Sequence, residues 1–90
     1  MENENILIEY GLQLQRIITH YHSLYNSTHV EKKEFLRVST EPLTDEIAKL
    51  NVNTVNEMII HNDMIINQEV LESVNKLSLQ SVVNFVCTIK

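Results

Sequence analysis

Apolar and polar residues repeat with helical periodicity along much of the chain, most clearly between residues 5 and 26. At about 100° per residue, the apolar and aromatic side chains of this stretch fall within an arc of roughly 120°. They are Ile6, Leu7, Tyr10, Leu14, Ile17, Ile18, Tyr21, Leu24 and Tyr25. Polar residues such as Gln13 and Arg16 point away from this arc. The pattern predicts one amphipathic helix of about six turns with one face toward a core.

Two apolar residues of this helix, Ile8 and Leu12, lie outside the main arc and one turn apart. They form a second, smaller strip that one bundle face cannot cover, so we expect another surface to cover it. Gly11 lies at the edge of the main arc. It costs a helix roughly 1 kcal/mol relative to Ala, and we interpret it as a site of close helix packing or of a slight bend.

The middle of the chain has a weaker pattern. Thr28 and Glu31 have the spacing of a capping box, which predicts a short second helix over residues 29–37, although residues 35–40 also fit an extended segment. Pro42 predicts a break near Glu41. A third helix is expected to start just after it, capped by Thr40 or Thr44, and to run to residue 61.

A Met-Ile-Ile triplet occurs twice, at residues 58–60 and 64–66. A continuous helix would then be apolar nearly all round. We favour the alternative, a helical hairpin that turns at residues 61–63, with Asp63 as the cap of the next helix. From residue 69 to residue 89 the helical periodicity is clear again, through Val74, Leu77 and Phe85.

The composition agrees with an all-α fold. The chain has 90 residues, one glycine and one proline, which leaves little material for the tight turns of β structures. We predict a single helical domain over residues 1–90: a small bundle of three or four helices with a long first helix and a C-terminal helical pair. Because so short a chain buries a small fraction of its surface, we also expect a homodimer.

The charge and the apolar runs exclude two classes of partner. Twelve acidic and seven basic residues give a net charge of −5, and the basic residues do not cluster, so we expect no nucleic-acid partner. No apolar run approaches the roughly 18 residues of a membrane span, and no signal peptide is visible, so we expect no membrane contact and a cytoplasmic location. The single cysteine, Cys87, is expected to be a small buried side chain.

The sequence contains none of the common motifs of catalytic sites. It has no phosphate-binding glycine loop, no His-Glu-x-x-His motif, no cysteine pair and no acidic calcium loop. His61 and Asp63, with help from His20, His22 or His29, are the best candidates for a metal or acid–base site. We interpret them as polar turn and surface residues, and expect no enzyme activity and no cofactor.

The predicted function is therefore protein binding. We expect a small acidic helical adaptor or inhibitor of another protein, and ten asparagines and ten isoleucines indicate AT-rich codons, as in low-GC bacteria and their phages. An obligate subunit of a helical hetero-complex and a small metal-dependent enzyme using His61 and Asp63 are the alternatives. The predicted partner-binding residues are Ile8, Leu12, Tyr21, Tyr25, Met58 and Met64.

Overall fold

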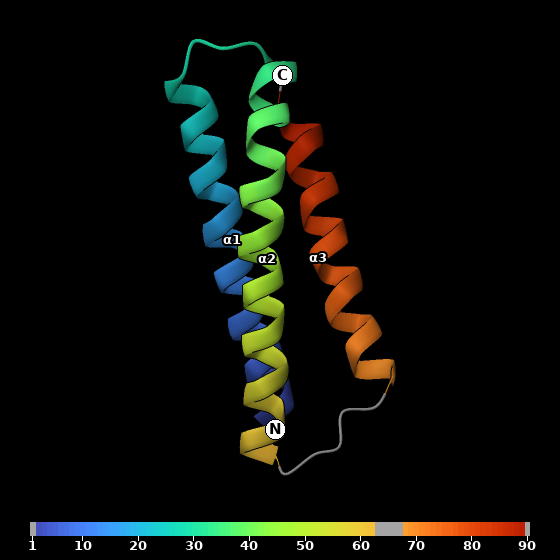
Figure 1. Cartoon of the computed structure of the whole chain (residues 1–90). Helices are drawn as coiled ribbons and strands as arrows, with labels where there is room; N and C mark the ends of the chain where they lie inside the picture. Colours follow the sequence, from blue (N-terminus) through green and yellow to red (C-terminus); the bar gives the residue numbers. More distant parts are fainter. Residues whose placement is uncertain (1, 63–67, 90) are drawn as a thin grey trace.

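The computed structural model describes residues 2–62 and 68–89 and contains three helices in that part of the chain. They are α1 (Glu2–Ser27), α2 (Lys32–Asn62) and α3 (Gln68–Thr88). Each helix runs antiparallel to the one before it, so that the three form a slender bundle of 48 × 19 × 17 Å (Figure 1). The predicted all-α bundle of three or four helices is confirmed, with three.

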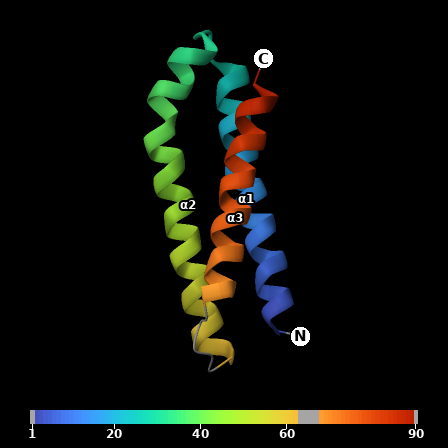
Figure 2. The ribbon, with the colours of Figure 1, turned by 90° about the vertical axis from the view of Figure 1, so that its right-hand side faces the viewer.

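The apolar arc of α1 forms one wall of the core, as its periodicity predicts. Tyr10, Leu14 and Tyr21 are buried, and most of the other members of the arc pack against them. Val74 and Phe85 of α3 close the core, together with Ile89 just after the end of this helix. Figure 2 shows α3 lying alongside both α1 and α2, so that each helix contributes one face to a common centre.

The predicted break near Glu41 is wrong, because α2 continues through Pro42 as one helix of 31 residues. The proline removes one backbone hydrogen bond and crowds the preceding turn, at a cost of about 3 kcal/mol. Phe35, Leu43 and Ile47 are all buried, and they carry the core face of the helix from one side of the proline to the other. Burying these side chains offsets the cost, so the prediction of a separate short helix over residues 29–37 is also wrong.

The two ends of the first connection are capped differently from the prediction. The Thr28 hydroxyl donates to the carbonyl of Tyr25 at 3.0 Å and so closes the end of α1 instead of starting α2. The backbone N–H of Phe35 donates to the carbonyl of Glu31 at 2.9 Å. Glu31 is therefore the N-cap of α2, because its carbonyl accepts the first hydrogen bond of the helix.

The preferred break after the first Met-Ile-Ile triplet is confirmed, because α2 and α3 are separate antiparallel helices (Figure 1). The predicted position of the turn is wrong for His61 and Asn62, which are still part of α2. Asp63, the proposed cap of the next helix, lies outside the described residues. The predicted last helix over residues 69–89 agrees with α3 to within one residue at each end.

A polar layer crosses the core at mid-height and joins all three helices. The Tyr10 hydroxyl of α1 is hydrogen-bonded to Asn51 Oδ1 of α2 and to Ser78 Oγ of α3. Ser78 Oγ also lies 2.8 Å from Asn51 Oδ1 and 3.0 Å from the carbonyl oxygen of Val74. Burial raises the pKa of Tyr10, and its hydrogen bond with Ser78 partly opposes this. The layer fixes the height of each helix relative to the others, because shifting one helix would leave buried polar groups unpaired.

Candidate functional site

The second apolar stripe of α2 is not used by the core of the chain. Ala48, Val52, Val55 and Ile59 follow one another at spacings of four, three and four residues, the spacing of a coiled-coil seam. They lie about 100° around the helix from the buried stripe, at 3.6 residues per turn. Val52 is 58% exposed, and Ile59 is also exposed. The stripe therefore faces away from α1 and remains open.

The adjoining face of α3 is also apolar. An open groove of about 360 Å³ runs between the two helices and is lined by Ala48, Asn51, Val52, Val55, Asn56, Leu71 and Asn75. We call it the α2–α3 groove. Farther along α3, Leu79 is 67% exposed and Val83 is also exposed, and we call these two residues the α3 ridge. Leu71, Asn75, Leu79 and Val83 follow one another at a spacing of four residues, so the ridge continues the row of α3 residues that borders the groove. We call groove and ridge together the α2–α3 face.

The electrostatics of this face are neutral. None of the residues that line the groove carries a charge, although the chain has a net charge of −5. The nearest charged positions along each helix are of both signs, Asp45 and Lys49 on α2 and Glu72 and Lys76 on α3. The face is suited to removing apolar surface from water, and it offers no group for acid–base or nucleophilic chemistry.

Apart from the raised pKa of Tyr10, whose hydroxyl is hydrogen-bonded to Asn51 of the groove lining, the pKa shifts of the described groups occur at residues outside that lining. Burial raises the pKa of Tyr21, and the nearby carboxylates of Glu46 and Asp45 raise it further. A hydrogen bond with Arg37 lowers the pKa of Glu34, and this exposed pair lies near the start of α2. These shifts reflect packing and one surface ion pair, and they mark no reactive centre.

The predicted partner-binding residues fall into two groups. Ile8 and Leu12 are 62% and 46% exposed on α1, so the second strip of this helix is an outward surface. A shallow hollow beside Leu12 is lined by residues of α1 alone. A Cβ placed on Gly11 would meet nothing within 4 Å, so the interpretation of close packing at this glycine is wrong.

Tyr21 and Met58 are core residues, with 7% and 1% exposure, and are therefore removed from the set of surface residues that a partner can reach. Tyr21 belongs to the buried stripe of α1 and Met58 to the buried stripe of α2, so both side chains point into the core. Tyr25 is half-buried, with its ring 5.1 Å from the ring of Phe35. Met64 lies outside the described residues. That Ile8, Leu12 and Tyr25 bind a partner stays a prediction.

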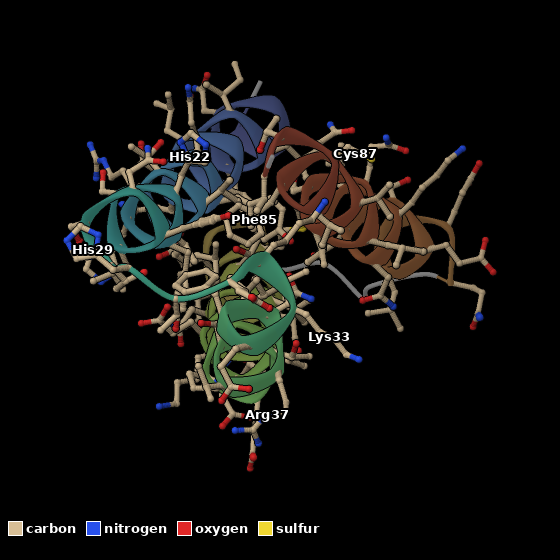
Figure 3. The ribbon with its side chains drawn as sticks, turned by 90° about the horizontal axis from the view of Figure 1, so that it is seen from above. His22, His29, Lys33, Arg37, Phe85 and Cys87 are labelled. Carbon is tan, nitrogen blue, oxygen red and sulfur yellow. The ribbon has the colours of Figure 1, made fainter. Side chains whose placement is uncertain are left out.

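The candidate metal site at His61 and Asp63 stays a prediction that the described residues do not test. His61 and Asp63 have no described side chains. Elsewhere in residues 2–62 and 68–89, no three His, Cys, Asp or Glu side chains lie close enough to hold a metal ion. The ring of His22 packs edge-on against Phe85 at 6.5 Å, whereas His29 lies in the connection after α1 (Figure 3).

Cys87 is exposed, so the prediction of a buried cysteine is wrong. Seen from above, it lies on the outer side of α3, whereas Phe85 points to the centre of the bundle (Figure 3). The two residues are two positions apart, and residues at that spacing lie on different faces of a helix.

Sequence reasoning missed the α2–α3 face as a unit. The spacing of Ala48, Val52, Val55 and Ile59 was a visible signal, but it is obscured by the buried stripe on the same helix. Leu79 and Val83 gave no such signal, because they lie outside the row of Val74 and Phe85 that marks the core face of α3. Comparisons with known proteins add no further assignment: no family model, no curated protein and no solved structure matches the chain. Among the described residues, no helix is long and apolar enough to cross a membrane.

Proposed function

We propose that this chain is a non-enzymatic protein-binding module, a small acidic helical adaptor or inhibitor. Its working surface is the α2–α3 groove with the α3 ridge. The single observation that carries the proposal is that an apolar groove with an uncharged lining lies open between two neighbouring helices, with exposed Leu79 and Val83 in the same row of α3. A groove between two helices suits one amphipathic helix of another polypeptide chain, which would complete a four-helix arrangement.

The size of the face supports this proposal. The exposed apolar residues are Val52 and Leu71 of the groove, Leu79 and Val83 of the ridge, and Ile59, which continues the Val52 stripe on α2. They are between 40% and 67% exposed. Together they present on the order of 500 Å² of apolar surface, near the upper end for the largest patch of a monomeric protein, and such patches commonly bind other molecules. A partner covering this surface would be held mainly by apolar burial, and a cytoplasmic location agrees with the predicted role.

An obligate subunit of a helical hetero-complex is the second candidate. It is favoured by the same exposed face, since a chain that exposes so much apolar surface gains stability when a partner covers it. The two candidates differ in whether the isolated chain is stably folded. The buried core and the polar layer joining all three helices favour a module that folds alone. A metal-dependent enzyme using His61 and Asp63 stays an alternative prediction, because the side chains of both residues lie outside the described part of the structure.

Site-specific photo-crosslinking tests the proposal. A photoreactive amino acid is placed singly at position 52 in the groove or position 79 on the ridge, and at position 60 as the control. Ile60 is 75% exposed on α2, away from the groove stripe. We expect positions 52 and 79 to crosslink to one and the same protein, and position 60 to give little product. Equal crosslinking at all three positions, or none at 52 and 79, would contradict the proposal.

A further inference from the structure

The groove and the ridge of the α2–α3 face lie at different heights along α3. The groove is centred near residue 73 of α3, between Leu71 and Asn75, and the ridge is centred near residue 81, between Leu79 and Val83. At a rise of 1.5 Å per residue, the two centres are about 12 Å apart along the helix. A two-fold axis perpendicular to α3 halfway between them exchanges ridge and groove. Surfaces exchanged in this way form an isologous interface.

The polar layer sets which residues would meet across such an axis. Asn51 and Ser78 are hydrogen-bonded to each other and therefore lie at the same height in the bundle. Counting 1.5 Å per residue from that level along each helix, the two-fold rotation places Leu79 of one copy at the height of Val52 and Val55 in the other. Leu79 of each copy then enters the groove of the other copy, so the same contact is made twice.

The area agrees with a stable dimer. An apolar surface of on the order of 500 Å² on each copy gives about 1,000 Å² for a pair. Homodimer interfaces are about 65% apolar, so the whole interface would bury about 1,500 Å², inside the standard range of roughly 1,200–2,000 Å².

The uncharged lining of the groove keeps the repulsion between two copies small. Two chains with a net charge of −5 repel each other, and the repulsion is smallest where the surface carries no charge. The groove lining is uncharged, and the flanking helical positions supply both signs from each copy. A strongly basic partner helix would require acidic residues around the groove. Lys49 of α2 and Lys76 of α3 flank the groove instead, so its borders do not suit such a partner.

We infer that the occupant of the α2–α3 face is a second copy of this chain, bound through ridge and groove about a two-fold axis. The inference rests on the proposed function, because it names the partner of the same surface. The dimer leaves the outward strip of α1, with Ile8 and Leu12, uncovered on both copies.

The experiment compares three single variants with the wild-type chain by light scattering over a concentration series. Leu79→Glu changes the ridge and Val52→Lys changes the groove. Ile60→Glu is the matched control, since it adds the same charge as Leu79→Glu at an exposed apolar position on another face.

We expect the wild-type chain and the control to give twice the chain mass of 10.5 kDa. Leu79→Glu and Val52→Lys should weaken the dimer at least about 30-fold, as substitutions at interface hot spots do. Helicity is followed in parallel, and it should not change, because both residues are exposed in the single chain.

Mixing the two weakened variants is the decisive step. In the mixed dimer, one ridge-to-groove contact pairs the new carboxylate at position 79 with the new ammonium at position 52, and the other contact is wild type. We therefore expect a heterodimer where each variant alone is monomeric. A wild-type dimer that Leu79→Glu leaves intact, or a mixture that stays monomeric, would overturn the inference.

The outcomes also separate the inference from the proposed function. A folded monomer whose positions 52 and 79 crosslink to a different protein would overturn the second copy and keep the protein-binding module. A folded monomer that crosslinks to nothing at these positions would overturn both.

Discussion

Removing the hydroxyl of Tyr10 tests the polar layer that sets the relative height of the three helices. In Tyr10→Phe the ring stays in the core, and only the hydrogen bonds to Asn51 and Ser78 are lost. The Ser78 hydroxyl then donates its one proton to Asn51 Oδ1 at 2.8 Å or to the Val74 carbonyl at 3.0 Å. No buried polar group is orphaned, so the loss is a net hydrogen-bond contribution of about 0.5–1.5 kcal/mol.

Urea unfolding followed by circular dichroism measures this loss. With an m-value of about 1–2 kcal/mol/M for a chain of this size, the midpoint should fall by roughly 0.5–1 M with no change in slope. All variants are compared at one protein concentration, because the unfolding of a dimer depends on concentration. A double-mutant cycle with Ser78→Ala should give a coupling of about 1 kcal/mol between the two positions.

The pH dependence of stability provides a second test of the Tyr10 hydroxyl. Burial raises the pKa of Tyr10 above its ordinary value of 10.0, so the folded chain holds this proton more tightly than the unfolded chain does. The contribution of Tyr10 to the free energy of unfolding is therefore fully present below about pH 10, and it is lost as the pH rises through the raised pKa. The difference between wild type and Tyr10→Phe should therefore shrink above pH 10. A midpoint unchanged at pH 7 together with zero coupling would refute the polar layer.

Three further changes have expected outcomes. Gly11→Ala should raise the free energy of unfolding by about 0.5–1 kcal/mol, because the residue is helical and the added Cβ meets nothing within 4 Å; no gain in thermal midpoint would mean that α1 is not helical there. Pro42→Ala should stabilise the chain by about 1–3 kcal/mol, because α2 runs through this exposed residue; a loss of stability in urea would instead indicate a helix start at Pro42. Tyr21→Phe should reduce the fall of stability above pH 10 in a pH series, since burial and the Glu46 and Asp45 carboxylates raise the pKa of Tyr21; an unchanged alkaline limb would contradict this.

The class of fold and two of the three helices could be predicted from the sequence. The arc through Tyr10, Leu14 and Tyr21 and the row through Val74 and Phe85 have a clear helical period, and these residues are buried. In such segments the local pattern and the tertiary packing require the same helix, so a single sequence is enough. The outward strip of Ile8 and Leu12 could be predicted for the same reason, because two residues outside the main arc cannot reach the same core.

The middle helix and the candidate site depended on tertiary structure. Pro42 is a strong local signal for a break, and only packing against α1 and α3 offsets it, through buried Phe35, Leu43 and Ile47. α2 carries two apolar stripes, and sequence alone does not tell which one the other helices cover. The position of α3 decides this: the polar layer with Asn51 and Ser78 holds it at one height, one stripe of α2 is buried, and the stripe through Val52 and Val55 is left open beside Leu71. Helical period is a property of neighbouring residues, whereas the choice between two faces is made by contacts between helices far apart in the chain.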